Sequence, residues 1–448
     1  MNMYDEPARE LPVVEDCDIC VIGGSTTGVF AAVAAARLGQ RVALVEALGL
    51  FGGNATASLV NVWHSRFDTA GQREIVGGLA IETMERLKKR GAAMDRGPQP
   101  DWQYAFSPAE LAIELDEWVR EHSSIRPFLH ARCCRAFVTT PGRVEAVAIE
   151  DKTGRRVIRA RIFIDASGDA DLVYQSALPT YRRAVVQPPT TCFLAAGLGA
   201  SAEALSKRVF DPDIPGALRP GYLWSAPVPG TGLRMVAGTR VHGADVSDAD
   251  SLTQAEMEGR RQVRAMLDIA RATVPGCEQA RLAALPARIG ERESRHIRGL
   301  HELKETEILH GQRFPDAIAN GSYRVDVHAG GGDGLVFRYL DGREIHVRAG
   351  GQSEEGRWAP AEGRRATFYQ IPYRSLVPRG AANVLAAGRC LDADEGAFGA
   401  VRVMINAAQT GQAAGVAAAL AAQGDGMVAA VDVQRLRAEL AAQGAVIL

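Results

Sequence analysis

The fold is decided near the start of the chain, by residues 18–46, which read DICVIGGSTTGVFAAVAAARLGQRVALVE. Residues 18–22 predict a short buried strand, and the glycine-rich turn 23–28 follows it directly. The Ala-rich run 29–38 favours a helix that stops at Gly39, a residue typical of helix C-termini. Residues 41–45 predict a second strand, which ends on Glu46. This pattern indicates one βαβ unit of an α/β domain.

The glycine turn has the spacing of a dinucleotide-binding site. Backbone N–H groups at a helix N-terminus, together with the helix dipole, bind a negatively charged pyrophosphate. The full pattern is GxGxxG, with an acidic residue about twenty positions later for a ribose hydroxyl. Here Gly23, Ser25 and Gly28 fill the glycine positions, and Glu46 is the acid. Serine is small and its hydroxyl can donate to a phosphate, so we interpret this segment as a nucleotide site. The alternative is a plain turn of an α/β domain.

Further segments resemble a known family. The opening VIGGSTTG is similar to the start of FAD-dependent oxidoreductases of the glutathione-reductase superfamily. Later segments resemble, more narrowly, a bacterial family called FAD-dependent oxidoreductase. They are residues 51–56 (FGGNAT), 164–171 (IDASGDAD), 289–295 (IGERESR), 371–378 (IPYRSLVP), 387–390 (AGRC) and 399–404 (GAVRVM). The resemblance covers nearly the whole chain and implies FAD, which the glycine turn alone cannot distinguish from NAD.

The resemblance also implies a fold and a division of the chain. The fold is α/β, with a Rossmann-like FAD-binding domain of glutathione-reductase type, similar to that of fumarate reductases, and an inserted α+β substrate domain. We expect residues 1–187 and 366–448 to form the FAD-binding domain and residues 188–365 the substrate domain. Within the insert, residues 197–202 have the form GxGxxA. We reject a second nucleotide site there, because no helix, strand and terminal acid follow the motif.

By the same resemblance, FAD would be held by residues far apart in the sequence. The ADP half would lie on the first βαβ unit, and the ribityl chain and flavin would lie against the later segments. The last helix is expected to begin near residues 399–400, with its positive end aimed at the flavin. Arg389 departs from the superfamily, where many relatives carry an acid for the ribityl hydroxyls; Asp392 or Asp394 is the alternative contact. The predicted FAD-binding residues are Gly23, Gly24, Ser25, Thr27, Gly28, Glu46, Gly53, Asn54, Thr56, Ser167, Gly168, Asp169, Gly388, Arg389, Ala400 and Val401.

Catalytic candidates are polar residues in the matched segments and in the second lobe. A substrate that loses a hydride needs a base, and a carboxylate substrate needs an arginine fork. Alternation along residues 323–328 puts Arg324, Asp326 and His328 on one strand face, which predicts either a cleft lining or a solvated face. Arg402, expected in the first turn of the last helix, needs an anionic partner: substrate, FAD or a carboxylate. The catalytic candidates are His328, Arg295, Tyr373 and Arg402, with Arg292, Arg374 and His64 as further ones.

Composition restricts the partners and the compartment. The formal net charge of −2 gives no reason to expect nucleic acid or an anionic membrane. Residues 413–422 are apolar but too short to span a bilayer. Seven cysteines in 448 residues, without zinc spacing, predict neither disulfides nor a metal site. We expect a cytoplasmic protein with a small-molecule substrate and an unidentified electron donor or acceptor, and the oligomeric state is left open.

Three functions are compatible with these residues. The first is a dehydrogenase or reductase that moves a hydride between a small organic substrate and flavin. The second is a flavin monooxygenase or oxidase that uses dioxygen. The third is a non-catalytic flavoprotein that senses redox state, which would bind FAD without substrate-dependent bleaching. The first fits the absence of a second nucleotide domain, because a single site would then serve both half-reactions. The third is disfavoured, because the polar candidates gather in the segments expected to meet the flavin.

Overall fold

The computed structural model describes residues 3–99, 102–199, 202–219, 221–328, 334–347, 353–363 and 365–448. Its centre is a parallel sheet in the order β6-β2-β1-β9-β22. The strands are β6 (Ile125–Phe128), β2 (Val42–Val45), β1 (Val13–Ile22), β9 (Gly154–Asp165) and β22 (Val384–Ala386). Where β1, β2, β9 and β22 lie side by side, at residues 19–22, 42–45, 162–165 and 384–386, the strands are mostly apolar and fully buried, as parallel sheets require. The predicted first βαβ unit is confirmed, with α1 (Thr26–Ala36) between β1 and β2.

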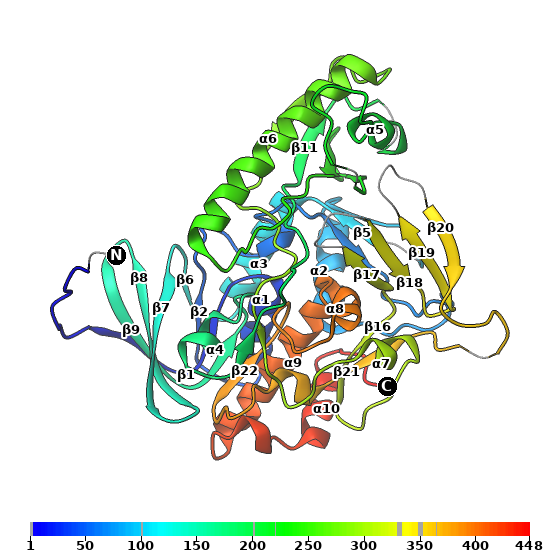
Figure 1. Ribbon diagram of the computed structural model, residues 1–448. Helices are drawn as coiled ribbons and strands as arrows, with labels where there is room; N and C mark the ends of the chain where they lie inside the picture. Colours follow the sequence, from blue (N-terminus) through cyan, green and yellow to red (C-terminus); the bar gives the residue numbers. More distant parts are fainter. Residues whose placement is uncertain are drawn as a thin grey trace.

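At one end of β9 the same sheet continues with antiparallel strands. β7 (Arg132–Thr140) and β8 (Arg143–Asp151) pair antiparallel with each other, and β8 pairs antiparallel with β9. β8 and β9 form a hairpin, in which Asp151 pairs with Gly154 across the turn. Figure 1 shows these strands at one side of the molecule, away from the other sheets.

Helices pack closely against the central sheet, and the tightest pair joins the two ends of the chain. α9 (Met404–Gln423) crosses α1 at two glycines. A Cβ on Gly411 would lie 2.1 Å from Thr27 O, and one on Gly415 would lie 2.1 Å from Ala31 O. These two backbones therefore touch in a way that only glycine permits. The other helices of this half are α2 (Gly78–Lys89), α3 (Pro108–Arg120), α4 (Asp171–Gln175) and α10 (Val433–Ala442).

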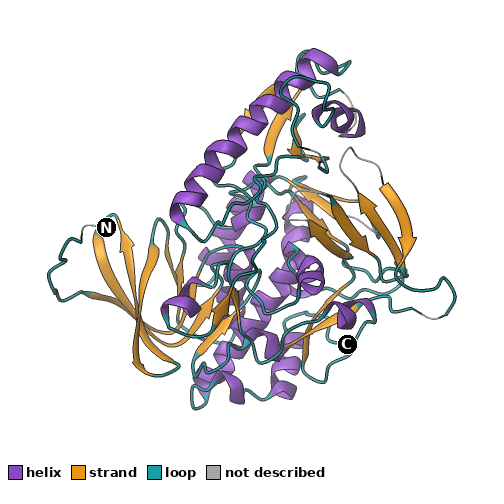
Figure 2. Cartoon of the chain, viewed as in Figure 1, coloured by secondary structure: helices purple, strands orange, loops and turns teal. Residues whose placement is uncertain are grey.

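The middle of the chain forms smaller sheets around the core (Figure 2). One sheet, in the order β12-β13-β11-β14, is covered by α5 (Ala202–Val209) and α6 (Ala249–Thr273); another has the order β17-β18-β19-β20. The sheet β3-β5-β4, which comes earlier in the chain, packs against the sheet β12-β13-β11-β14, and the pair β16-β21 packs on α9 through β16. The strands are β3 (Val62–His64), β4 (Ala93–Asp95), β5 (Trp102–Phe106), β11 (Phe193–Ala196), β12 (Trp224–Pro227), β13 (Arg234–Ala237), β14 (Arg281–Ala284), β16 (Ala317–Gly321), β17 (Val325–His328), β18 (Leu335–Arg338), β19 (Arg343–Val347), β20 (Ser353–Arg357) and β21 (Tyr369–Pro372).

The GxGxxA motif lies between β11 and α5, and its residues 200 and 201 lie outside the described residues. A helix does follow the motif, contrary to the expectation. However, the next strand, β12, pairs antiparallel with β13. The motif therefore does not open a parallel βαβ unit, which a nucleotide site of this type requires. Among the described helices, none combines the length and the apolar character needed to cross a bilayer.

The prediction that the last helix begins near residues 399–400 is wrong. A separate helix, α8 (Glu395–Val401), comes first, because the Asp394 carboxylate caps it by accepting the Ala397 N–H at 2.9 Å. Val403 is extended, with ψ 145°, and α9 starts after it. The Ala400 carbonyl accepts hydrogen bonds from the Tyr369 hydroxyl and the Asn406 amide, each at 3.1 Å, which stabilises the break.

Candidate functional site

A cavity of about 290 Å³ opens at the carboxyl edge of the parallel sheet. Its lining includes the residue that directly follows each of four strands: Gly23 after β1, Glu46 after β2, Ala166 after β9 and Ala387 after β22. In open parallel sheets, ligands bind in the crevice outside the carboxyl ends of the strands. The cavity therefore occupies the position expected of a nucleotide site.

The first turn of the cavity wall requires its glycines. Gly23 has φ +101°, in the region that favours glycine, and a Cβ there would lie 2.4 Å from Ala166 O. A Cβ on Gly28 would lie 1.8 Å from Gly23 O. These contacts hold the N-terminus of α1 directly against the end of β1.

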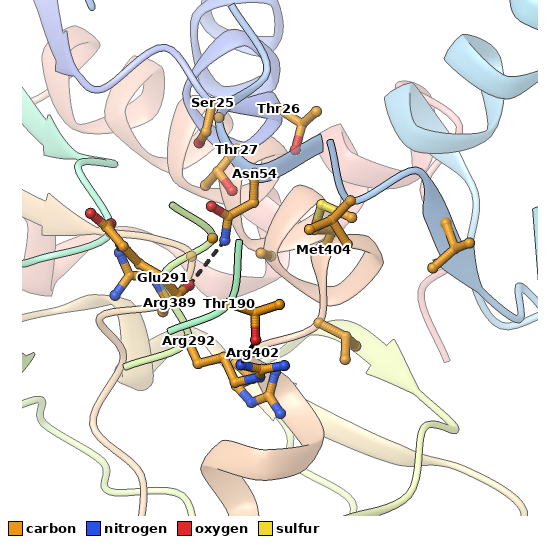
Figure 3. Close-up of a pocket in the computed structure, with 18 of the residues that line it drawn as sticks. Ser25, Thr26, Thr27, Asn54, Thr190, Glu291, Arg292, Arg389, Arg402 and Met404 are labelled. Carbon is orange, nitrogen blue, oxygen red and sulfur yellow. Dashed lines mark hydrogen bonds and ion pairs between the residues drawn. The ribbon is translucent and has the colours of Figure 1, made fainter. Parts of the chain in front are cut away.

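The N-terminus of α1 provides donors for an anion. Its first intrahelical bond runs from the Val29 N–H to Ser25 O, so the N–H groups of the preceding helical residues have no acceptor within the helix. Ser25 is the N-cap, but its side chain makes no capping hydrogen bond. Its hydroxyl can therefore donate to a phosphate. Figure 3 shows Ser25, Thr26 and Thr27 together at one end of the cavity.

A second glycine accommodates the serine that replaces the middle glycine of the fingerprint. Gly53 lies opposite Ser25, and a Cβ on it would be 2.7 Å from the Ser25 Cβ. Gly53 has φ +57° and begins the short 3-10 turn Gly53–Ala55. The space that the Ser25 side chain needs is thus provided by the absence of a side chain at Gly53. The glycine turn can therefore keep the conformation of a nucleotide-binding turn.

Glu46 has the placement of a ribose-binding acid. Its carboxylate accepts the Gly24 N–H at 2.7 Å and the Leu48 N–H at 2.8 Å, which fixes its orientation at the end of β2. The side chain is buried but lines the cavity. The glycine cradle, the helix N-terminus and this carboxylate together fit the ADP half of FAD.

Arg389 forms ion pairs with acidic side chains of the protein itself. Its guanidinium lies 2.8 Å from both Asp169 and Glu291 and donates to the Ser294 hydroxyl at 3.0 Å. Burial raises the pKa of Asp169, but the charges of Arg389 and Arg288 outweigh it and hold that pKa below its usual value. This cluster joins the end of β22, the loop after β9 and the segment 288–295. It forms the floor of the cavity beside Asn54, whose amide donates to Glu291 O at 3.0 Å (Figure 3).

The two acids considered as alternatives to Arg389 are not in the cavity lining. Asp392 accepts the Gly299 N–H at 2.9 Å, and Asp394 caps α8. Both carboxylates therefore accept hydrogen bonds from backbone N–H groups of the protein.

The far end of the cavity contains a histidine and a carboxylate from β17. His328 Nε2 lies 3.2 Å from Asp326 Oδ1, and the Tyr323 hydroxyl donates to Asp326 Oδ2 at 2.8 Å. All three side chains are buried and line the cavity. Burial and the charge of Arg292 lower the pKa of His328 well below its usual value, although Asp326 opposes the shift. The imidazole is therefore neutral near pH 7. Among the described residues, its Nδ1 atom has no hydrogen-bond partner.

The face that holds these groups follows the predicted alternation only in part. Arg324, Asp326 and His328 all line the cavity, as the cleft interpretation expects. Tyr323, expected on the opposite face with Val325 and Val327, lines the cavity too. The reason is that β17 begins only at Val325, so the period of two does not extend back to Tyr323.

Arginines dominate the charge at this end. Arg292, Arg324 and Arg402 line the cavity, and Arg402 lies 3.4 Å from Asp326. Arg402 follows α8 as its C-cap, so it is not in the first turn of the last helix. Besides the N-terminus of α1, the N-terminus of α9 reaches the cavity, through Val403 and Met404.

Several predicted site residues support the cavity wall from behind. Gly24 packs against Phe51, and the Thr56 hydroxyl donates to Phe51 O at 2.6 Å. Ala400 and Val401 are buried in α8. With Gly28 and Asp169, these residues are absent from the lining, whereas the other predicted FAD-binding residues belong to it.

Three catalytic candidates lie elsewhere. Arg295 pairs with Asp171 at 3.0 Å, and its guanidinium stacks on a tyrosine ring. The Tyr373 hydroxyl donates to Val428 O at 2.6 Å in the interior. Arg374 pairs with Asp316 at 3.0 Å. None of the three lines the cavity in the described part of the chain, while His64, His328, Arg292 and Arg402 do.

The apolar wall of the cavity could not be predicted from the sequence. That wall is built from residues of β3, β5, β12, β13 and β18 and from residues just before β3, β11 and β12. Hydrophobic residues at such positions are ordinarily core residues, so only the packing of distant strands identifies them. They are Val60, Val62, Trp102, Cys192, Tyr222, Trp224, Ala237 and Phe337.

Comparison with known proteins places the chain in a family. The family model described as FAD dependent oxidoreductase matches residues 18–440. Among solved structures, a geranylgeranyl bacteriochlorophyll reductase-like protein from Thermoplasma acidophilum is 13% identical, with 96% of this chain and 84% of that chain covered and a TM-score of 0.48. A flavoprotein/dehydrogenase from Cytophaga hutchinsonii is 14% identical, with 94% and 82% covered and a TM-score of 0.47. The p-nitrophenol 4-monooxygenase from Pseudomonas putida DLL-E4 is 11% identical, with 92% and 79% covered and a TM-score of 0.42. No curated protein matches the chain.

Proposed function

Because the chain belongs to the FAD-dependent oxidoreductase family, we propose that it moves a hydride between FAD and a small organic substrate bound beside His328. The protein is an enzyme, and FAD is its cofactor. The observation that carries the proposal is a single cavity that extends from the glycine turn at Gly23 to the buried His328 and Asp326. Cofactor and substrate would therefore share one water-restricted space, as direct transfer between them requires.

The residues at the glycine end would hold the ADP half of FAD. The N-terminus of α1 and Ser25 would bind the pyrophosphate, and Glu46 would bind the ribose. When bound, FAD supplies the capacity to accept and release a hydride. The N-terminus of α9, at Met404, would favour negative charge on a flavin bound in the cavity.

His328 is the residue placed to handle the proton. When a substrate C–H bond gives up its hydride, the neighbouring O–H or N–H group must lose a proton. The neutral imidazole offers Nδ1 for that proton, because the carboxylate beside Nε2 favours the other hydrogen there. Asp326 then stabilises the imidazolium, as a positioning residue. In the direction of substrate reduction, the same group returns the proton.

We further propose that the FAD domain is of glutathione-reductase type. Two features support this: the parallel order β6-β2-β1-β9-β22, and the antiparallel strands β7 and β8 that continue from β9. We also propose a reducing compartment such as the cytoplasm, since all seven cysteines of the chain are unpaired thiols.

The proposal is tested by anaerobic mixing of the FAD-bound protein with a panel of small alcohols, amines and hydroxy acids. We expect one class to bleach the visible flavin band. For that substrate, the His328→Gln variant should reduce the flavin about 100-fold or more slowly, with unchanged FAD content. His310→Gln, at an exposed position, is the matched control and should behave as wild type.

Other outcomes favour the alternatives. Oxygen incorporation into a product, without anaerobic bleaching, would indicate a monooxygenase. A protein that binds FAD but neither bleaches nor consumes oxygen with any of these compounds would point to the sensing function. Equal bleaching rates for wild type and His328→Gln would remove His328 from the mechanism.

A further inference from the structure

The far end of the cavity, which contains His328 and Asp326, has an excess of positive charge. Arg292 and Arg402 line it, and Asp326 is the carboxylate beside them in the described lining. Arg240 lies close enough to add its own charge to Arg292. Arg288 and Arg389, by contrast, are neutralised by Glu291 and Asp169 at the other end of the cavity. The imbalance is therefore local to the end where we place the substrate.

Arg292 contacts only neutral acceptors among the described residues. Its guanidinium donates to Pro188 O at 2.5 Å and to the Thr190 hydroxyl. Burial, followed by the charges of Arg240 and Arg402, lowers the pKa of Arg292 to about 9. Burial and these neighbouring charges destabilise the charged form of Arg292, so an anion bound beside it would be stabilising.

Arg402 has spare donors as well. Its Nη2 atom is 3.4 Å from Asp326, a long contact, and its buried Nε has no partner in the described residues. Asp326 is shared with His328 and with the Tyr323 hydroxyl, so one carboxylate serves three groups. Figure 3 shows the guanidinium groups of Arg292 and Arg402 side by side, well away from Ser25 and Thr26 at the pyrophosphate end.

An apolar wall stands next to this pair. Cys192 lies two residues after Thr190, which accepts a hydrogen bond from Arg292. Cys192 packs with Val62 and Trp102. The wall also includes the aromatic residues Tyr222, Trp224 and Phe337, and the Arg324 guanidinium lies 4.4 Å from the centre of the Phe337 ring. Flat aromatic faces of this kind fit a ring-sized apolar body.

We propose that the substrate is an organic carboxylate with a ring-sized apolar body, its carboxylate held between Arg292 and Arg402 and its body against Trp102, Trp224 and Phe337. This inference rests on the proposed function, because it names the substrate class of the same site. Two guanidinium groups provide the fork that a carboxylate accepts. The bound anion would also offset the field of Arg292 on the nearby imidazole. The base would therefore be strongest when the substrate is in place.

Calorimetric titration of the FAD-bound protein tests this without turnover, with benzoate and its neutral isostere benzamide as probes. We expect saturable benzoate binding and at least about 30-fold weaker benzamide binding. Arg292→Met and Arg402→Met should each weaken benzoate binding about 10- to 100-fold, and Arg292→Lys should lie between Arg292→Met and wild type. Arg374→Met, which removes an arginine outside the cavity lining, is the matched control. Visible flavin absorbance of each variant verifies that it is folded and loaded.

The results separate this inference from the proposed function. Equal binding of benzoate and benzamide, or unchanged benzoate binding in Arg292→Met, overturns the inference. If a neutral substrate then bleaches the flavin, hydride transfer stands and the anion site does not. If benzoate binds through the arginines but no compound bleaches the flavin, the anion site stands and hydride transfer fails. A flavin band that shifts in Arg402→Met, with benzoate binding unchanged, would assign that guanidinium to the flavin.

Discussion

Replacing Gly28 by alanine should weaken FAD binding and stability together, because the added methyl group has no space. A Cβ at this position would lie 1.8 Å from Gly23 O and 3.4 Å from the Ala166 Cβ. The first distance is roughly 1.5 Å short of an ordinary contact, and the atom it meets is backbone. The conflict can be relieved only by moving the N-terminus of α1 away from the end of β1.

The size of the effect follows from that movement. Overpacking of this kind destabilises a protein by about 1–3 kcal/mol. A shift of α1 also moves the Thr26 and Thr27 N–H groups away from the pyrophosphate. Loss of one hydrogen bond to a charged group costs about 1.5–3 kcal/mol, which corresponds to about 10- to 100-fold in the dissociation constant for FAD.

A second Gly→Ala variant isolates the contact from the general effect of the substitution. Gly232 is exposed and a Cβ on it would meet no atom within 4 Å. Both variants restrict the unfolded chain equally, which favours folding by about 0.4–1 kcal/mol. FAD affinity is measured by fluorescence quenching during reconstitution of the apoprotein, and stability by thermal unfolding. If Gly28→Ala binds FAD and unfolds like Gly232→Ala, the close packing of α1 on the glycine turn is refuted.

Three further predictions concern charged groups. Glu46→Gln should weaken FAD binding about 10-fold, measured by the same reconstitution, because the amide replaces an acceptor oxygen with a donor; an unchanged affinity would exclude Glu46 as the ribose ligand. Arg389→Met should destabilise the protein by about 3 kcal/mol in chemical denaturation, because it leaves Asp169 buried without its main partner; the double variant with Asp169→Asn should recover part of the loss. Wild type should lose stability as the pH falls below about 6.5, since the lowered pKa of His328 means that the unfolded chain binds this proton first. His328→Gln should lose less over that range, and parallel pH profiles for the two proteins would contradict this.

The nucleotide end of the cavity was predictable because its signals are local. The strand, the glycine turn and the helix of residues 18–46 follow one another in the chain, so their spacing alone carries the geometry. Glu46 reaches the cavity for the same reason, since it ends the second strand of that unit. Ser25 is the position at which the sequence departs from the GxGxxG pattern. Its compensation by Gly53 could not be predicted, because only the folded chain brings these two residues into contact.

The break between α8 and α9 was not predictable, and it changes where the positive helix end lies. Residues 395–423 are mostly small and apolar, which favours one continuous helix. The break depends on hydrogen bonds to the Ala400 carbonyl from Tyr369 and Asn406, and Tyr369 comes from a distant strand. Arg402 consequently lies between two helices, with its guanidinium at the cavity, and not on the flank of one.

The position of Arg402 also bears on what the far end of the cavity can bind. On the first turn of a helix, the charge of Arg402 would be repelled by the positive end of the helix dipole. An anion bound at that helix N-terminus would offset the repulsion. In the gap between α8 and α9, its side chain instead lies beside Arg292, which comes from another part of the chain. Two buried arginines from separate segments repel each other in every state without an anion between them. Folding alone does not require that arrangement, because replacing either arginine by an apolar residue would remove the repulsion. The arrangement is explained if an anionic substrate completes it, and the benzoate titration tests that explanation directly.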